Sequence, residues 1–406
     1  MPDAEELVGD AVTAARGSDV RRAERQLDRL MIGAVDAAGT RQVDTALLDR
    51  LARGVGRLVP RGWQPADLAR IATRRLGSRD AGLVVDALAA HRRDLTAPVP
   101  EWWDAQLREL DASVWWEADG RHLTGWSART GTDRYSALRA AVAAVALLDG
   151  LPPVALLRPP PGSPVAVSGG GRTGGSRMLD RVRALLAKAE STTFPAEAEA
   201  LTGKAQELIA RHSIEAALLA APGTDEVPTG VRLGTEAPYA GAKALLVQEV
   251  AAANRCEAVW SDDLGFSTVL GWAADLEAVE LLYTSLLVQA TAAMLRGRDQ
   301  RRPTGGRRTR GYDESFLNAF ALRIGERLRS ATGAATESAG TDRLLPVLAA
   351  RSEAVRERLD TLFPGVTRAR LTVRDAEGWS SGTAAADAAS LAPGRPARPV
   401  RGGRRR

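Results

Sequence analysis

The sequence contains a single cysteine and three histidines, and this scarcity excludes several kinds of site. Cys256 has no partner for an internal disulfide, which fits a protein of a reducing compartment. His91, His122 and His212 lie far apart along the chain, without cysteine or carboxylate neighbours at metal-site spacing. Cys256 also lacks a recognisable histidine partner for thiol catalysis. We therefore expect no bound metal.

The motifs of common cofactor and nucleophile sites are missing as well. The chain has no GxSxG motif and no dinucleotide fingerprint. The glycine-rich residues 168–176 are not followed by Lys-Ser or Lys-Thr, which a phosphate-binding loop requires. We therefore expect no cofactor, and no motif identifies a catalytic residue. No apolar run reaches the roughly 20 residues that cross a bilayer, and the acidic start lacks a signal-peptide core. We therefore expect a cytoplasmic protein without membrane contact.

Aromatic residues make up only 4% of the sequence, yet five of the nine tryptophans fall between residues 102 and 126. Clustered tryptophans usually close a small helical core. They also occur at protein interfaces and stack on nucleic-acid bases. Helical apolar stripes recur through residues 1–150, separated by glycine and proline. The sequence thus predicts a helical N-terminal region, and docking of a protein partner there remains an alternative role.

Positive charge is concentrated in two segments. The formal net charge is +5; residues 296–310 carry a net +6, and residues 395–406 contain six arginines and no acid, so the remaining chain carries −7. Proline, glycine and charge predict a disordered loop over 296–311 and a disordered tail over 393–406. Arginine on such a backbone binds phosphate bidentately and stacks on bases. The predicted nucleic-acid-binding residues are Arg301, Arg302, Arg307, Arg308, Arg310, Arg401, Arg404, Arg405 and Arg406.

The stretch Met178–Ala221 has the clearest helical pattern. A first apolar stripe ends at the hydroxylated residues 191–193, and Pro195 fits the first turn of a second helix. The second stripe comprises Leu201, Ala205, Leu208 and Ile209. Ser213 is placed to cap a third short helix, so the sequence predicts a three-helix module over 178–222. Two helices joined by a tight turn also describe a helix-turn-helix DNA reader.

This stretch resembles a bacterial and phage family of domains of unknown function, number 2786. The family has no established activity, so the resemblance implies no mechanism. Its members often carry a companion domain after the helices, and the resemblance continues loosely to about Leu328. Gly378-x-x-x-Gly382, followed by an alanine-rich helix, is also similar to the end of the family's proteins.

Downstream spacing predicts a small α+β domain. A strand is expected at Val231–Leu233, and β-like runs at Cys256–Trp260 and Phe266–Trp272 flank a hairpin turn. The expected helices are Ala242–Asn254, Ala274–Arg296, Tyr312–Ser330, Leu344–Leu362 and Gly382–Leu391. Residues 331–341 look irregular, and Arg370–Arg374 looks like a strand.

The predicted fold is therefore mainly α: a helical N-terminal region, a three-helix module, then a small α+β domain with an antiparallel β-hairpin sheet. The predicted domains are a helical region at 1–150, a Pro/Gly linker at 151–177, the three-helix module at 178–222, the companion domain at 231–392 with the basic loop 296–311, and the tail 393–406.

Carboxylates are the remaining candidates for acid–base chemistry. Asp275 opens a predicted helix, where a capping role explains it. The alternative is a carboxylate site for Mg²⁺ on a nucleic-acid phosphate. The polar residues that would form a pocket are Lys243, Asn254, Asp275, Tyr283 and Arg323.

These patterns favour a non-enzymatic protein that associates with DNA or RNA through its arginines. One alternative is a scaffold that binds a protein partner through residues 1–150. The other is an enzyme with its site in residues 239–323.

Overall fold

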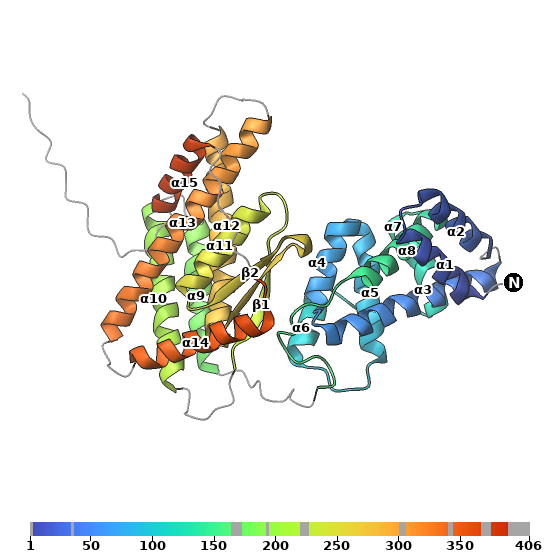
Figure 1. Cartoon of the computed structure of the whole chain (residues 1–406), viewed down its shortest axis with the longest axis horizontal. Helices are drawn as coiled ribbons and strands as arrows, with labels where there is room; N and C mark the ends of the chain where they lie inside the picture. Colours follow the sequence, from blue (N-terminus) through green and yellow to red (C-terminus); the bar gives the residue numbers. More distant parts are fainter. Residues whose placement is uncertain are drawn as a thin grey trace, which may run out of the picture. The chain divides into compact units, whose positions relative to one another are not determined.

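The computed structural model describes residues 3–33, 36–163, 173–191, 195–219, 227–299, 306–339, 344–366 and 375–388. The chain divides into two compact units, Met1–Gly170 and Gly171–Arg406. Over the described residues it is mainly helical, with one three-stranded antiparallel sheet in the second unit (Figure 1). The predicted mainly α fold with a small α+β part is confirmed.

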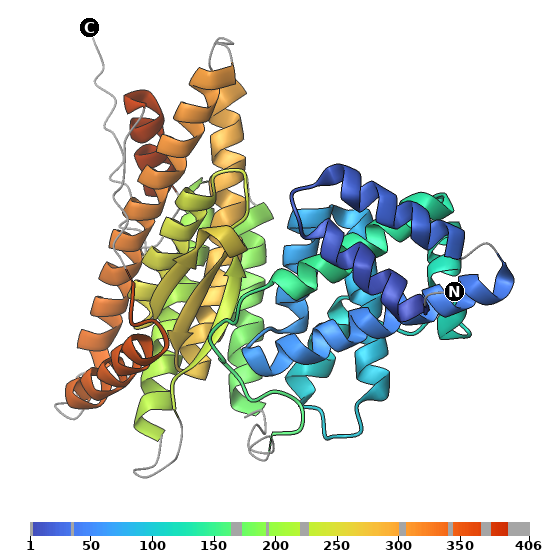
Figure 2. The ribbon, with the colours of Figure 1, turned by 45° about the vertical axis from the view of Figure 1, so that its right-hand side comes forward.

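Unit 1 is a helical bundle, which Figure 2 shows without a strand among the described residues. Its α-helices are α1 (Ala4–Ala15), α2 (Val20–Gly33), α3 (Ala37–Leu58), α4 (Pro65–Leu76), α5 (Ser78–Asp94), α6 (Glu101–Glu109), α7 (His122–Thr130) and α8 (Arg134–Gly150). Local signals set their ends: Asp36 accepts a hydrogen bond from Gly39 N at the start of α3, and Pro65 occupies the first position of α4.

The clustered tryptophans serve the core of unit 1. Trp103, Trp116 and Trp126 are buried, as the packing interpretation predicts. Trp115 is half-buried, and its Nε1 donates to Asp86 Oδ1 at 2.8 Å. The carboxylate of Asp86 also lies 2.8 Å from Nε2 of the buried His122. The tryptophan rings and the polar groups beside them therefore make contacts within the bundle.

The first part of the predicted linker belongs to unit 1. Val154 N donates to Arg61 O, and Trp63 Nε1 donates to Pro152 O. Leu157 is buried. Residues 151–163 are thus packed chain and not a free spacer, because their apolar and backbone groups find partners on the bundle. Residues 164–172 lie outside the described residues.

Unit 2 contains the stretch that resembles family 2786. Its α-helices are α9 (Thr173–Ser191), α10 (Pro195–Leu219), α11 (Ala240–Ala253), α12 (Ala273–Asp299), α13 (Gly306–Ala339), α14 (Leu344–Leu362) and α15 (Ala376–Ala388). The predicted third helix of the module is wrong. Ser213 lies inside α10, where its hydroxyl donates to Asp275 Oδ1 and so serves a tertiary contact instead of a cap.

The sheet has the strand order β1-β3-β2. Strand β1 (Thr229–Gly234) pairs antiparallel with β3 (Phe266–Gly271), and so does β2 (Glu257–Ser261). The predicted hairpin between β2 and β3 is confirmed, with Gly265 in the left-handed region at φ 75°. Val269 of the central strand faces Val231 on β1 and Ala258 on β2.

One hydrophobic core unites the helices of unit 2 and the sheet. It contains Val182 and Ile209 from the helix pair together with Val250, Val269 and Phe316. Helix α14 lies crosswise to α12 and α13 (Figure 1). The helix pair α9–α10 therefore packs as an integral part of unit 2.

Helix α12 is long and apolar enough, by length and composition, to cross a membrane. In the structure its side chains Leu276, Val279, Leu282 and Leu286 are buried within unit 2. This placement is that of a core helix.

The glycines of the Gly378-x-x-x-Gly382 motif bring α15 directly onto α13. A Cβ atom at Gly378 would lie 2.5 Å from Tyr312 O, and one at Gly382 would lie closer still to Phe316 O. The helices run in the same direction, since Asp387 farther along α15 pairs with Arg323. Only glycine allows two backbones to approach so closely.

Three predicted boundaries change. Helix α13 continues through the predicted irregular stretch 331–341 as far as Ala339, and α15 begins at Ala376 instead of Gly382. The predicted disordered loop 296–311 is largely helical: α12 extends to Asp299, and α13 begins at Gly306. Arg370–Arg374 and the tail 393–406 lie outside the described residues.

Candidate functional site

The last turn of α12 and the first turns of α13 form a positively charged end of the helix pair, here called the basic end. Its described side chains are Arg296, Arg298 and Arg310, all exposed. Arginine in the last turn of α12 complements the negative end of that helix dipole. Arg310 in contrast lies near the positive end of α13, whose first turn holds no acidic residue. The charge there lacks the compensation that helix electrostatics favours.

A buried carboxylate anchors the basic end. The Asp313 side chain is 1% exposed, and its Oδ2 lies 3.5 Å from Arg298 Nη1. The hydroxyl of Tyr239 donates to the same oxygen at 2.5 Å. Burial and the Asp313 carboxylate raise the pKa of Tyr239 to about 12, while Arg298 and Arg310 act in the opposite direction. Tyr239 therefore remains a protonated donor at neutral pH and sits within the field of both arginines.

The start of α11 adds a second cation at a positive helix end. Tyr239 precedes α11 in the left-handed region at φ 63°, and no acidic residue occupies the first turn. Lys243 Nζ donates to Glu236 O at 2.8 Å. Burial lowers the pKa of the half-buried Lys243, and Glu236 partly opposes that shift.

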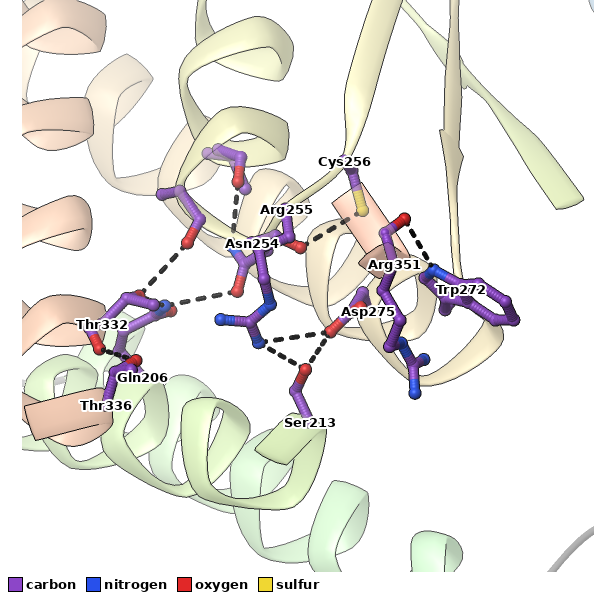
Figure 3. A network of polar contacts seen from close by, with 12 residues as sticks. Gln206, Ser213, Asn254, Arg255, Cys256, Trp272, Asp275, Thr332, Thr336 and Arg351 are labelled. Carbon is purple, nitrogen blue, oxygen red and sulfur yellow. Dashed lines mark hydrogen bonds and ion pairs between the residues drawn. The ribbon is translucent and has the colours of Figure 1, made fainter. Parts of the chain in front are cut away.

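A separate polar network joins α10 to the rest of unit 2 (Figure 3). Gln206 Nε2 donates to Asn254 Oδ1 at 3.2 Å and to Thr332 Oγ1 at 2.9 Å. Asn254 Nδ2 donates in turn to Val250 O. These contacts fix the middle of α10 against the end of α11 and the C-terminal part of α13.

The same network contains a buried ion pair. Arg255, in the left-handed region at φ 58°, donates to the Ser213 hydroxyl, which donates to Asp275. Arg255 Nη2 lies 3.8 Å from Asp275 Oδ1. Burial, and secondarily Asp275, raise the pKa of Cys256 well above its usual range. The thiol is consequently an unreactive core group.

The structure does not bring the five predicted pocket residues together. Asn254 and Asp275 share the polar network, but both are buried. Tyr283 donates to Gly234 O, Lys243 belongs to the start of α11, and Arg323 pairs with Asp387 and Glu326 at the exposed surface. Of the five residues, Asn254 and Asp275 share a network, and the other three contact different partners. An enzyme with its site in 239–323 stays a prediction.

Three of the nine predicted nucleic-acid-binding arginines lie on α13, and the other six lie outside the described residues. Arg310 is exposed on α13. Arg307 and Arg308 belong to the first turn of α13. Outside the described residues lie Arg301, Arg302, Arg401, Arg404, Arg405 and Arg406.

Sequence reasoning missed Tyr239, Asp313, Gln206 and Arg255. Their contacts join positions distant in sequence, 74 residues apart for Tyr239 and Asp313. The sequence signal that could have indicated these contacts was the presence of polar residues within apolar helical stripes, such as Gln206, which is buried. In the described part of the chain, no group of three or more His, Cys, Asp or Glu side chains is placed to hold a metal ion.

Comparison with known proteins yields one match. No curated protein and no solved structure matches the chain. Residues 177–216, which cover most of α9 and α10, match the family described as a protein of unknown function (DUF2786), so this segment resembles that family.

Proposed function

We propose that this protein is a non-enzymatic, cytoplasmic nucleic-acid-binding protein whose basic end contacts the phosphate backbone. The supporting observation is the placement of cations at positive helix ends: Arg310 near the start of α13 and Lys243 near the start of α11. Cations at positive helix ends whose first turns hold no acidic residue favour a polyanion. The arginines at 301, 302, 307 and 308 and those of the tail add further positive charge to the sequence, which also favours attraction to phosphate.

The test is fluorescence anisotropy of the full chain with labelled duplex and single-stranded DNA and with RNA. Affinity should fall steeply as salt increases, because each neutralised phosphate releases counterions. Replacing Arg296, Arg298 and Arg310 with Gln should weaken binding. The log–log salt slope on duplex DNA should flatten by about 0.9 for each phosphate that the variant no longer neutralises.

The matched control removes three exposed arginines elsewhere, Arg108, Arg211 and Arg356, and changes the net charge equally. It should bind as the parent does. Equal weakening of both variants would show attraction by net charge alone. Failure of the parent to bind at about 10 µM in roughly 50 mM salt would overturn the proposal.

A further inference from the structure

A groove lies between α9 and α12. Its volume is about 460 Å³, and its lining includes Leu186, Ala187 and Leu281. The carboxylates of Glu190, Glu277 and Glu280 stand at its rim, and all three residues are exposed. The groove thus combines an apolar floor with an acidic rim.

Two of the three rim carboxylates, those of Glu190 and Glu277, are not neutralised by the cation beside them. Arg183 also lines the groove, but its Nη1 donates to Asp180 at 2.9 Å. Across the described residues, Glu190 and Glu277 have no hydrogen-bond or ion-pair partner. Two free carboxylates above an apolar floor are complementary to an arginine-rich segment with interspersed apolar residues.

We infer that this groove binds the chain's own C-terminal segment, residues 389–406. The segment contains six arginines and no acid, together with Leu391 and Val400. It follows α15, which is packed on α13 and also contacts α12. Its eighteen residues span up to about 60 Å when extended, compared with a radius of gyration of about 18 Å for a compact unit of this length.

Docking in the groove would occupy arginines that the proposed function assigns to nucleic acid. The acidic groove then competes with phosphate for the tail and tunes affinity from within the chain. This regulatory consequence rests on the proposed function, whereas the docking does not.

The test is disulfide crosslinking in the full chain. One variant carries Thr284→Cys, at the groove, with Ala397→Cys in the tail. The matched control carries Ser338→Cys, exposed on α13, with the same tail cysteine. Native Cys256 is buried and present in both. We expect the groove pair to form an intramolecular disulfide roughly tenfold faster than the control pair, because docking raises the effective concentration above that of the tether alone.

Neutralising the rim must abolish this difference. Glu190→Gln, Glu277→Gln and Glu280→Gln together should reduce the groove pair to the control rate, and about 0.5 M salt should weaken the preference. Glu337→Gln, Glu357→Gln and Asp360→Asn change the net charge equally at exposed positions of α13 and α14 and should have no effect.

Equal rates for the two pairs, or an unchanged rate after the rim is neutralised, would overturn the inference. So would a product that joins two chains, because the groove would then take the tail of a second copy. A separate measurement with duplex DNA present tests the competition: slower crosslinking supports the proposed function, while an unchanged rate counts against that function and leaves the docking result standing.

Discussion

Removing the Asp275 carboxylate should destabilise unit 2 strongly, because the substitution leaves a largely buried cation without its counterion. The Asp275 side chain is 3% exposed, and that of Arg255 is 18% exposed. In Asp275→Ala the Ser213 hydroxyl loses its acceptor, and the Arg255 guanidinium loses its ion-pair partner. The Ser213 hydroxyl cannot turn to water, since Ser213 is buried, and the Arg255 side chain reaches water only in part.

The magnitude follows from geometry. Two unit charges 3.8 Å apart attract by about 4 kcal/mol at an effective dielectric constant near 20, and desolvation offsets most of this in the intact pair. Breaking a buried pair by deleting one partner costs about 3–5 kcal/mol. Because Arg255 is partly exposed, we expect a loss of stability of about 3 kcal/mol, at the lower end of this range.

Urea unfolding, with hydrogen exchange and mass spectrometry to separate the two units, measures this destabilisation. Glu277→Ala, an exposed carboxylate in the same helix, should cost less than about 1 kcal/mol. The double variant Asp275→Leu with Arg255→Met should recover much of the stability, since neither charge is left unpaired. A destabilisation below about 1 kcal/mol for Asp275→Ala would refute the reasoning.

The remaining predictions concern packing and pH. Gly382→Val should lower the melting temperature, because its side chain would collide with Phe316 O; an overpacking cost of about 1–3 kcal/mol is expected, and an unchanged calorimetric transition would contradict the close helix contact. Gly333→Ala, in open space on α13, should instead stabilise by roughly 0.5–1 kcal/mol in the same assay. The raised pKa of Cys256 means that the folded state holds the thiol proton more tightly than the unfolded chain. Its contribution is therefore complete below the unfolded thiol pKa of about 8.5 and declines as pH rises above it. Urea midpoints should fall between about pH 8 and 9.5 more steeply for the parent than for Cys256→Ala, and parallel profiles would count against this coupling.

Elements with regular apolar spacing were predictable from the sequence. The expected helix Leu344–Leu362 coincides with α14, and the apolar stripes expected through residues 1–150 fall on helices such as α4. Their amphipathic pattern specifies both the conformation and the buried face. The β2–β3 hairpin was equally accessible, because Gly265 marks the left-handed position of its turn.

Elements decided by tertiary contacts were not predictable in this way. Ser213 reads locally as a cap, yet its hydroxyl is taken by Asp275 from another helix. The second stripe is also rotated: Leu201 is only partly buried, whereas Gln206 is fully buried. A single sequence does not reveal that a buried amide has partners on α11 and α13.

At the basic end, too, some features were predictable from the sequence and others depend on tertiary contacts. Its arginines were evident from composition, but their helical placement was not, since glycine, proline and charge favour a loop. The contact of Tyr239 with Asp313 depends on how α11 meets α13. The expectation of a protein partner for residues 1–150 stays a prediction.

Because α10 is anchored on other helices, the matched segment cannot be cut out or transferred to another protein by itself. The segment 177–216 that matches a family is shorter than the unit that folds, because Val182, Ile209 and Gln206 complete their contacts on α11, α12 and α13. An excised helix pair would present this apolar and amide face to water. A chain that acquires the pair by recombination must also supply a complementary receptor surface. The unit that folds is thus the pair together with the helices that receive it.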